Sequence, residues 1–240
     1  MVIQSVADLH VKIFADGADL DGMLRMYGKP WIQGFTTNPT LMRKAGVTDY
    51  KGFAQQVLAA IPDRPISFGA LSDDLDEMER HAREIAGWGS NLYVKVPITN
   101  TRGESTLELC RRLAGEGVKL NVTALPTLDQ VRGTAAALAG GAPAYVSIFA
   151  GRIADTGVDP VPVMTEALSI LSAAPNAELI WASPREILNV LQADEIGCDI
   201  ITVTHDLLKK LGGLGKDLDQ FSLETVQMFH RDAQASGYQL

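Results

Sequence analysis

The sequence predicts a single (β/α)8 barrel of the TIM type, followed by an extra C-terminal helix. The chain has 240 residues, which is a normal length for one α/β barrel. Short β-rich runs alternate with amphipathic helical stretches along the whole length, and no linker or low-complexity segment interrupts them. The β-rich runs are also apolar, as expected of strands that are covered on both faces. An open, doubly wound sheet is the structural alternative.

Eight segments carry the strand pattern, and turn or helix signals separate them. In chain order they are His10–Asp16, Ile32–Asn38, Pro65–Ser72, Leu92–Thr99, Lys119–Thr127, Tyr145–Gly151, Glu178–Ser183 and Ile200–Thr204. Since a closed parallel barrel of this type needs eight βα units, this number favours the barrel over the open sheet. We therefore expect residues 1–240 to form one barrel domain.

Helical patterns follow the predicted strands. Asp73–Gly87 has acidic residues in its first turn, including Asp73 and Asp74, and apolar residues at helical spacing. Glu104–Gly115 and Asp129–Leu138 show the same pattern. The range 216–235 predicts an additional amphipathic helix, which packs on the outside of the barrel or docks on a neighbouring subunit. A homo-oligomer is the expected assembly.

Composition and charge narrow the possible functions. A formal net charge of -8 argues against an extended nucleic-acid face, and 46% hydrophobic residues suit a large core. Cys110 and Cys198 lie far apart without a CxxC pair, so neither a disulfide framework nor a zinc knuckle is indicated. The start of the chain has no signal-peptide pattern, and no apolar run reaches membrane-spanning length. We expect a soluble cytoplasmic protein that binds no membrane.

In barrels of this class the reactive side chains lie at the carboxyl ends of the strands and in the loops that follow. Polar residues at the predicted strand ends are therefore the first candidates for a site. In chain order they are Asp16, Thr36, Thr37, Asn38, Ser72, Lys95, Asn121, Thr123, Ser147, Arg152, Ser183, Arg185, Thr202 and Thr204.

Lys95 lies within the strand pattern LYVKVPIT, between Val94 and Val96. By strand alternation it points into the barrel, together with Tyr93 and Pro97. A buried amine is unfavourable unless its pKa falls or it finds a partner, and a neutral amine is the nucleophile that attacks a carbonyl. Lys95 is therefore a candidate Schiff-base lysine, and a structural lysine paired with a buried carboxylate is the alternative.

Asp16 is the carboxylate at the end of the first strand. It can act as the ion partner of the lysine, as a general base, or as the N-cap of the next helix. Arg152 and Arg185 follow strands six and seven, and with Ser183 they suit a phosphate. A helix opened by Pro184 adds backbone N–H donors to this expected anion site. The alternative is that both arginines are ordinary surface residues.

At these residues the sequence resembles the transaldolase family, including its short branch with fructose-6-phosphate aldolase. The resemblance covers nearly the whole chain, and the pairing of TTNP with VKVPIT at this spacing is highly specific. The motifs are FADGADL, GFTTNPTLM, YVKVPIT, LNVTAL, SIFAGRI and WASPR.

The resemblance implies a transferase of carbohydrate metabolism, as in the pentose phosphate pathway. Such an enzyme moves a three-carbon dihydroxyacetone unit from a ketose phosphate to an aldose acceptor. Lys95 matches the Schiff-base lysine, Asp16 the group that takes the C4 hydroxyl proton, and Thr123 a threonine that positions the catalytic water. The residues that match substrate-binding positions are Thr37, Asn38, Asn121, Ser147, Phe149, Arg152, Ser183 and Arg185. Because a lysine imine is itself an electron sink, we expect no metal and no cofactor.

Two residues depart from patterns found within this family. Phe149 stands where aldolase members usually have a tyrosine, which favours transfer over simple release of dihydroxyacetone by an aldolase. Gly69 stands where the family has Glu or Gln to hold a catalytic water, and glycine cannot relay a proton. A water held by Thr123 and backbone can replace that side chain, or the pocket can be enlarged for another sugar. The remaining alternative is a weakened enzyme, which would act as a sugar-phosphate binding protein.

Overall fold

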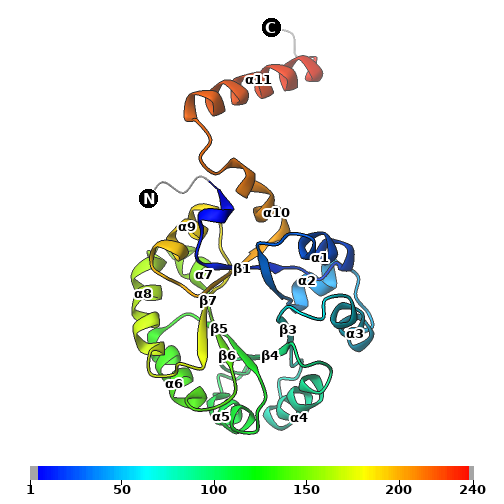
Figure 1. Cartoon of the computed structure of the whole chain (residues 1–240), viewed down its shortest axis with the longest axis vertical. Coiled ribbons are helices and arrows are strands. Elements are labelled where there is room, and N and C mark those ends of the chain that lie inside the picture. Colours follow the sequence, from blue (N-terminus) through cyan, green and yellow to red (C-terminus); the bar gives the residue numbers. More distant parts are fainter. Residues whose placement is uncertain (1–4, 238–240) are drawn as a thin grey trace.

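Eight parallel strands close into a barrel in the computed structural model, which describes residues 5–237 (Figure 1). Each strand pairs with the next in sequence, and β1 closes the barrel against β8. The strands are β1 Lys12–Asp16, β2 Ile32–Thr36, β3 Ile66–Gly69, β4 Leu92–Pro97, β5 Leu120–Leu125, β6 Ala144–Ile148, β7 Ala177–Trp181 and β8 Ile200–Thr204. The predicted barrel is confirmed, and each of the eight predicted segments contains one of these strands.

The helices surround the barrel, apart from the last one (Figure 1). They are α1 Leu20–Tyr27, α2 Pro39–Lys44, α3 Tyr50–Ala60, α4 Leu75–Ala86, α5 Leu107–Gly115, α6 Leu128–Leu138, α7 Ala150–Ala154, α8 Pro160–Leu171, α9 Leu188–Glu195, α10 His205–Leu208 and α11 Leu218–Ser236, with short 3-10 turns η1 Val6–Asp8 and η2 Lys209–Gly213. The three helices predicted after strands three, four and five are thus present as α4, α5 and α6.

Several predicted strands extend too far at their carboxyl ends. The second ends at Thr36 because Asn38 caps α2, where its side-chain oxygen accepts a hydrogen bond from the Leu41 N–H at 2.9 Å. The sixth ends at Ile148 rather than Gly151 because the chain turns directly into α7. These early turns form the mouth of the barrel.

Aromatic side chains pack in the half of the barrel interior that is nearer the amino ends of the strands. The rings of Tyr93 and Tyr145 stack with their centroids 4.0 Å apart, and Phe14 meets Tyr145 edge-on at 5.7 Å. Gly34 leaves room for this layer, since a Cβ there would lie 2.5 Å from the Phe14 ring. The base of the barrel is therefore packed core, and only its upper end is open to a substrate.

Strand β4 alternates as predicted. Val94 and Val96 are fully buried in the core cluster between barrel and helices, whereas Tyr93 packs with the aromatic layer inside. Lys95 lies on the same side of the strand as Tyr93 and lines the cavity above that layer.

Helix α11 extends away from the barrel (Figure 1) and contains no buried residue. The alternative in which it packs on the outside of its own barrel is therefore wrong. Its large apolar side chains are exposed, with Phe221 at 53% and Phe229 at 63%. Within residues 5–237, no helix is both long and apolar enough to cross a membrane.

Candidate active site

Two adjoining cavities, which we call lobes because they share five lining residues, lie at the carboxyl ends of the strands. The larger has a volume of about 450 Å³ and the smaller about 230 Å³. Lys95 lies where they meet, since it lines both. The other shared lining residues are Asn38, Pro39, Thr123 and Phe149.

The amine of Lys95 donates a hydrogen bond to the backbone carbonyl of Thr37 at 3.0 Å. Burial lowers the pKa of this amine below its ordinary value of 10.5, while the nearby charge of Asp16 opposes the shift. Among the described residues no carboxylate forms an ion pair with Lys95. The amine is thus available to a ligand and biased toward its neutral, nucleophilic form.

Asp16, at the end of β1, faces the larger lobe. One carboxyl oxygen accepts from the Thr36 hydroxyl at 2.8 Å and the other from the Asn38 amide at 3.3 Å. Burial raises the pKa of Asp16, while the Lys95 charge and these hydrogen bonds oppose the rise. The N-cap alternative is wrong, because α1 is capped by Asp19, which accepts from the Gly22 N–H at 2.8 Å.

A buried chain of polar groups lies beneath the cavity. The Ser147 hydroxyl donates to the Asn121 side-chain oxygen at 2.7 Å, and the Asn121 amide donates to the Ser67 hydroxyl at 3.0 Å. The Thr37 hydroxyl donates to the Ser67 carbonyl at 2.8 Å. Ser147 lines the larger lobe and Thr37 the smaller, whereas Asn121 is fully buried and lines neither. Asn121 therefore orients the hydroxyl groups of Ser147 and Ser67.

The two arginines line the larger lobe together with Ser183, but their surroundings differ. Arg185 forms an ion pair with Asp155, and its Nε lies 3.1 Å from the carboxylate. Arg152 has its guanidinium 5.5 Å from the Phe149 ring centroid, and no carboxylate within the described range pairs with it. Arg152 is therefore the guanidinium that is better placed for an anion.

No helix begins at Pro184, contrary to the sequence-based expectation. Helix α9 starts at Leu188, and the Asn189 side chain accepts hydrogen bonds from the N–H groups of Arg185 and Glu186 at 2.7 and 3.1 Å. These donors are thus already used. The N–H groups of Arg185 and Glu186 therefore do not contribute to an anion site.

The smaller lobe contains Gly69, the last residue of β3, which pairs in register with Lys95. A Cβ on Gly69 would meet nothing closer than the Lys95 Cβ, at 4.0 Å, so no close contact requires glycine there. The Tyr50 hydroxyl donates to the Gly69 carbonyl at 2.7 Å. The Thr123 hydroxyl is buried and finds no partner among the described residues.

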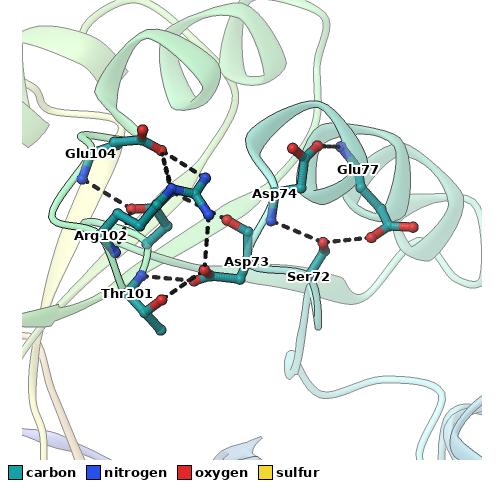
Figure 2. Close-up of polar contacts among 8 residues, drawn as sticks. Ser72, Asp73, Asp74, Glu77, Thr101, Arg102 and Glu104 are labelled. Atoms are coloured by element: carbon teal, nitrogen blue, oxygen red, sulfur yellow. Dashed lines mark hydrogen bonds and ion pairs between the residues drawn. The ribbon is translucent and has the colours of Figure 1, made fainter.

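Hydrogen bonds and ion pairs join the loop after β3 to the loop after β4, beside this lobe (Figure 2). Asp73 accepts hydrogen bonds from the backbone N–H and hydroxyl of Thr101, both at 2.7 Å, and lies beside Arg102. Only Asp74 begins the helix, as its side chain accepts from the Glu77 N–H at 2.9 Å. The helix-start role predicted for Asp73 is therefore wrong.

Tyr50 and Ser67 did not follow from the sequence. Tyr50 opens α3, outside the strands, and reaches the site only because α3 packs beside β3. Ser67 lies inside a short strand and carried no motif. By contrast, the position of Asp16 at a strand end and the alternation around Lys95 were enough to predict that these side chains lie at the mouth of the barrel.

A known protein family and individual relatives match most of the chain. The family model described as transaldolase/fructose-6-phosphate aldolase matches residues 13–240. The chain belongs to this family. A probable transaldolase of Dehalococcoides mccartyi is 35% identical over 202 residues, covering 84% of this chain and 90% of that protein. One from Roseiflexus castenholzii is 36% identical over 201 residues, covering 83% and 88%.

Solved structures of low sequence identity share the fold. A putative lyase/mutase from Burkholderia cenocepacia superposes with a TM-score of 0.56 at 12% identity, covering 95% of this chain and 85% of that one. A 2,3-dimethylmalate lyase gives 0.54 at 12% identity, covering 97% and 86%. At this identity the likeness supports the barrel fold alone.

Proposed function

We propose that this transaldolase-family enzyme transfers a three-carbon dihydroxyacetone unit from a ketose phosphate to an aldose acceptor through an imine on Lys95. The observation that carries the proposal is that the half-buried residues Lys95 and Asp16 line the same lobe at the mouth of the barrel, without an ion pair between them. Burial lowers the pKa of the Lys95 amine and raises the pKa of the Asp16 carboxyl, and each shift favours the neutral form of that group. Burial thus favours an amine that can act as a nucleophile and a carboxyl that can hold a proton.

The proton balance of the reaction supports this pairing. Lys95 attacks the C2 carbonyl, and loss of the oxygen as water consumes the proton of Asp16, which leaves an iminium cation beside a carboxylate. That carboxylate then takes the C4 hydroxyl proton as the C3–C4 bond breaks, and the bonding electrons neutralise the iminium as an enamine. Adding the enamine to a second aldehyde reverses these steps.

The two lobes determine how the substrate is oriented in the site. With C2 on Lys95, the carbons from C3 onward lie in the larger lobe beside Asp16, and the phosphate reaches Arg152 and Ser183. Asn38 and Ser147, which both line the larger lobe, each hold a substrate hydroxyl. Thr123 holds the water that exchanges at C2, and Phe149 forms an apolar wall of both lobes.

Transfer and simple release are separated by product analysis. We expect fructose 6-phosphate to be consumed rapidly only when an aldose phosphate acceptor is added, because Phe149 has no hydroxyl to protonate the enamine. Free dihydroxyacetone formed at the same rate without acceptor would identify an aldolase. Ligand-dependent thermal stabilisation without either product would identify a binding protein.

The exposed apolar face of α11 supports a homo-oligomer. The exposed apolar side chains of this helix, among them Phe221, Leu223, Val226 and Phe229, are unfavourable in water, and a second copy of the chain offers the same surface.

A further inference from the structure

We propose that Tyr50 holds and orients the water molecule that shuttles a proton between Lys95 and the C2 oxygen of the substrate. The inference rests on the proposed imine function and assigns a role to the smaller lobe. Tyr50 is a positioning residue in this account, because it acts on the reaction through water.

The chemistry at C2 needs a protic group of its own. In the proposed reaction Asp16 gives its proton only when the C2 oxygen leaves as water, and it then works at the C4 hydroxyl. It does not line the smaller lobe, so the earlier transfer of a proton from the Lys95 nitrogen to the C2 oxygen is left to another group. The protic side chains of the smaller lobe, apart from Lys95, are Thr37, Asn38, Tyr50 and Thr123.

Two of these four groups are already engaged. The Thr37 hydroxyl donates to the Ser67 carbonyl. The Asn38 side chain donates to Asp16 and accepts from the Leu41 N–H, and its second amide hydrogen is assigned to a substrate hydroxyl in the proposed reaction. Tyr50 and Thr123 remain. The buried Thr123 hydroxyl has no partner within residues 5–237, and the Tyr50 oxygen can still accept a hydrogen bond while it donates one.

Tyr50 is fixed in position. Its hydroxyl donates to the carbonyl of Gly69, the residue in register with Lys95. Its ring lies edge-on to Phe68 at 6.1 Å and tilted against Trp88 at 5.9 Å. Burial raises the pKa of the phenol, so the group stays protonated and neutral.

Gly69 leaves the space that such a water requires. The nearest heavy atom to a Cβ on Gly69 is 4.0 Å away, and the lobe of about 230 Å³ exceeds the roughly 30 Å³ that one water occupies in the liquid. A water that donates to Tyr50 and accepts from Thr123 therefore has polar partners on two sides.

The step balances without any other reagent. As the Lys95 nitrogen bonds to C2, it passes one proton to the held water, and the water passes one of its own protons to the C2 oxygen. The water is regenerated and the carbinolamine is neutral. The reverse transfer returns the amine and the ketone after turnover.

The test measures exchange of ¹⁸O from labelled water into the C2 carbonyl of fructose 6-phosphate. Exchange requires the carbinolamine to form, to lose its C2 oxygen as water and to be rehydrated, so slower carbinolamine formation slows it. Tyr50→Phe keeps the ring contacts and removes the hydroxyl, and we expect it to slow exchange at least about tenfold, since such groups typically contribute about 10²–10⁴-fold. Tyr27→Phe is the matched control, because the Tyr27 hydroxyl bonds the surface residue Asp63. It should leave the exchange rate unchanged.

A double variant separates water positioning from a structural effect. Adding Gly69→Gln to Tyr50→Phe supplies an amide in the open space, and we expect it to restore most of the exchange rate. Unchanged exchange in Tyr50→Phe would overturn the inference. So would slowed exchange that Gly69→Gln leaves unrestored.

Borohydride trapping on the wild-type enzyme separates this inference from the proposed function. If an adduct forms on Lys95 while Tyr50→Phe exchanges normally, only the inference fails. If no adduct forms on Lys95, the proposed function fails and the inference fails with it.

Discussion

At the residue scale, Lys95 and Asp16 depend on each other through charge. Burial disfavours the charged form of both, and each charge favours the charged form of the other. Strand alternation was enough to predict that Lys95 points inward. The sequence left three roles for Asp16, and the fold excludes the N-cap role because Asp19 caps α1.

Asp16→Asn should change the pH dependence of Lys95 in a defined direction. The carboxylate raises the pKa of the amine, so its removal lowers that pKa further below 10.5 and keeps the amine neutral to lower pH. The rate of Lys95 arylation by 1-fluoro-2,4-dinitrobenzene is followed by peptide mass spectrometry across a pH series. The fall in this rate toward acid pH should begin at a lower pH in the variant than in wild type. A fall that begins at a higher pH would contradict this coupling.

Arg152→Ala and Arg185→Ala should differ in their effect on phosphorylated donors. Arg152 has no carboxylate partner among the described residues, whereas Arg185 is paired with Asp155. A hydrogen bond to a charged group contributes about 1.5–3 kcal/mol, so we expect Arg152→Ala to raise KM for fructose 6-phosphate by about 10- to 100-fold. Arg185→Ala should have a clearly smaller effect. Equal losses would show that Arg185 leaves Asp155 to bind substrate.

At the element scale, the short helix α7 and the loop after β7 form one wall of the larger lobe. The sequence predicted a longer sixth strand and a helix at Pro184. The pattern of apolar residues does not reveal where contact with a neighbouring loop forces the chain to turn. Gly151 shows the constraint that was missed, since a Cβ there would lie 1.5 Å from the Ser183 carbonyl oxygen. Tyr50 escaped prediction for the same reason, as its contact with β3 is tertiary.

Gly151→Ala should therefore destabilise the protein and push helix α7, which carries Arg152, away from the loop that carries Ser183. We expect a loss of about 1–3 kcal/mol in the free energy of unfolding, as for other overpacked sites, together with a raised KM. Urea unfolding measures the first and steady-state kinetics the second. Gly115→Ala, at the end of α5 with open space around it, is the control and should not destabilise. Equal behaviour of the two variants would refute the tight contact.

At the scale of the whole molecule, the barrel followed from the number and spacing of its strands, but the direction of α11 did not. An amphipathic pattern predicts a helix with an apolar face and does not say which molecule covers that face. In the structure the helix leaves its own barrel, and its apolar residues stay exposed (Figure 1).

The assembly is testable on α11 itself. Phe221→Asp combined with Phe229→Asp should convert an oligomer to monomers in sedimentation velocity, because charge replaces the apolar contact. Gln227→Asp adds a charge on the same exposed helix and should leave the oligomer intact. A wild-type protein that sediments as a monomer would contradict the proposed assembly.

The most direct test of the central claim is borohydride reduction of the enzyme in the presence of fructose 6-phosphate. We predict that peptide mass spectrometry finds a reduced three-carbon adduct on Lys95, and that Lys95→Met abolishes it. Lys119, at the other end of the barrel near the Tyr93 ring, should remain unmodified. Absence of an adduct, or an adduct confined to another lysine, would contradict the account.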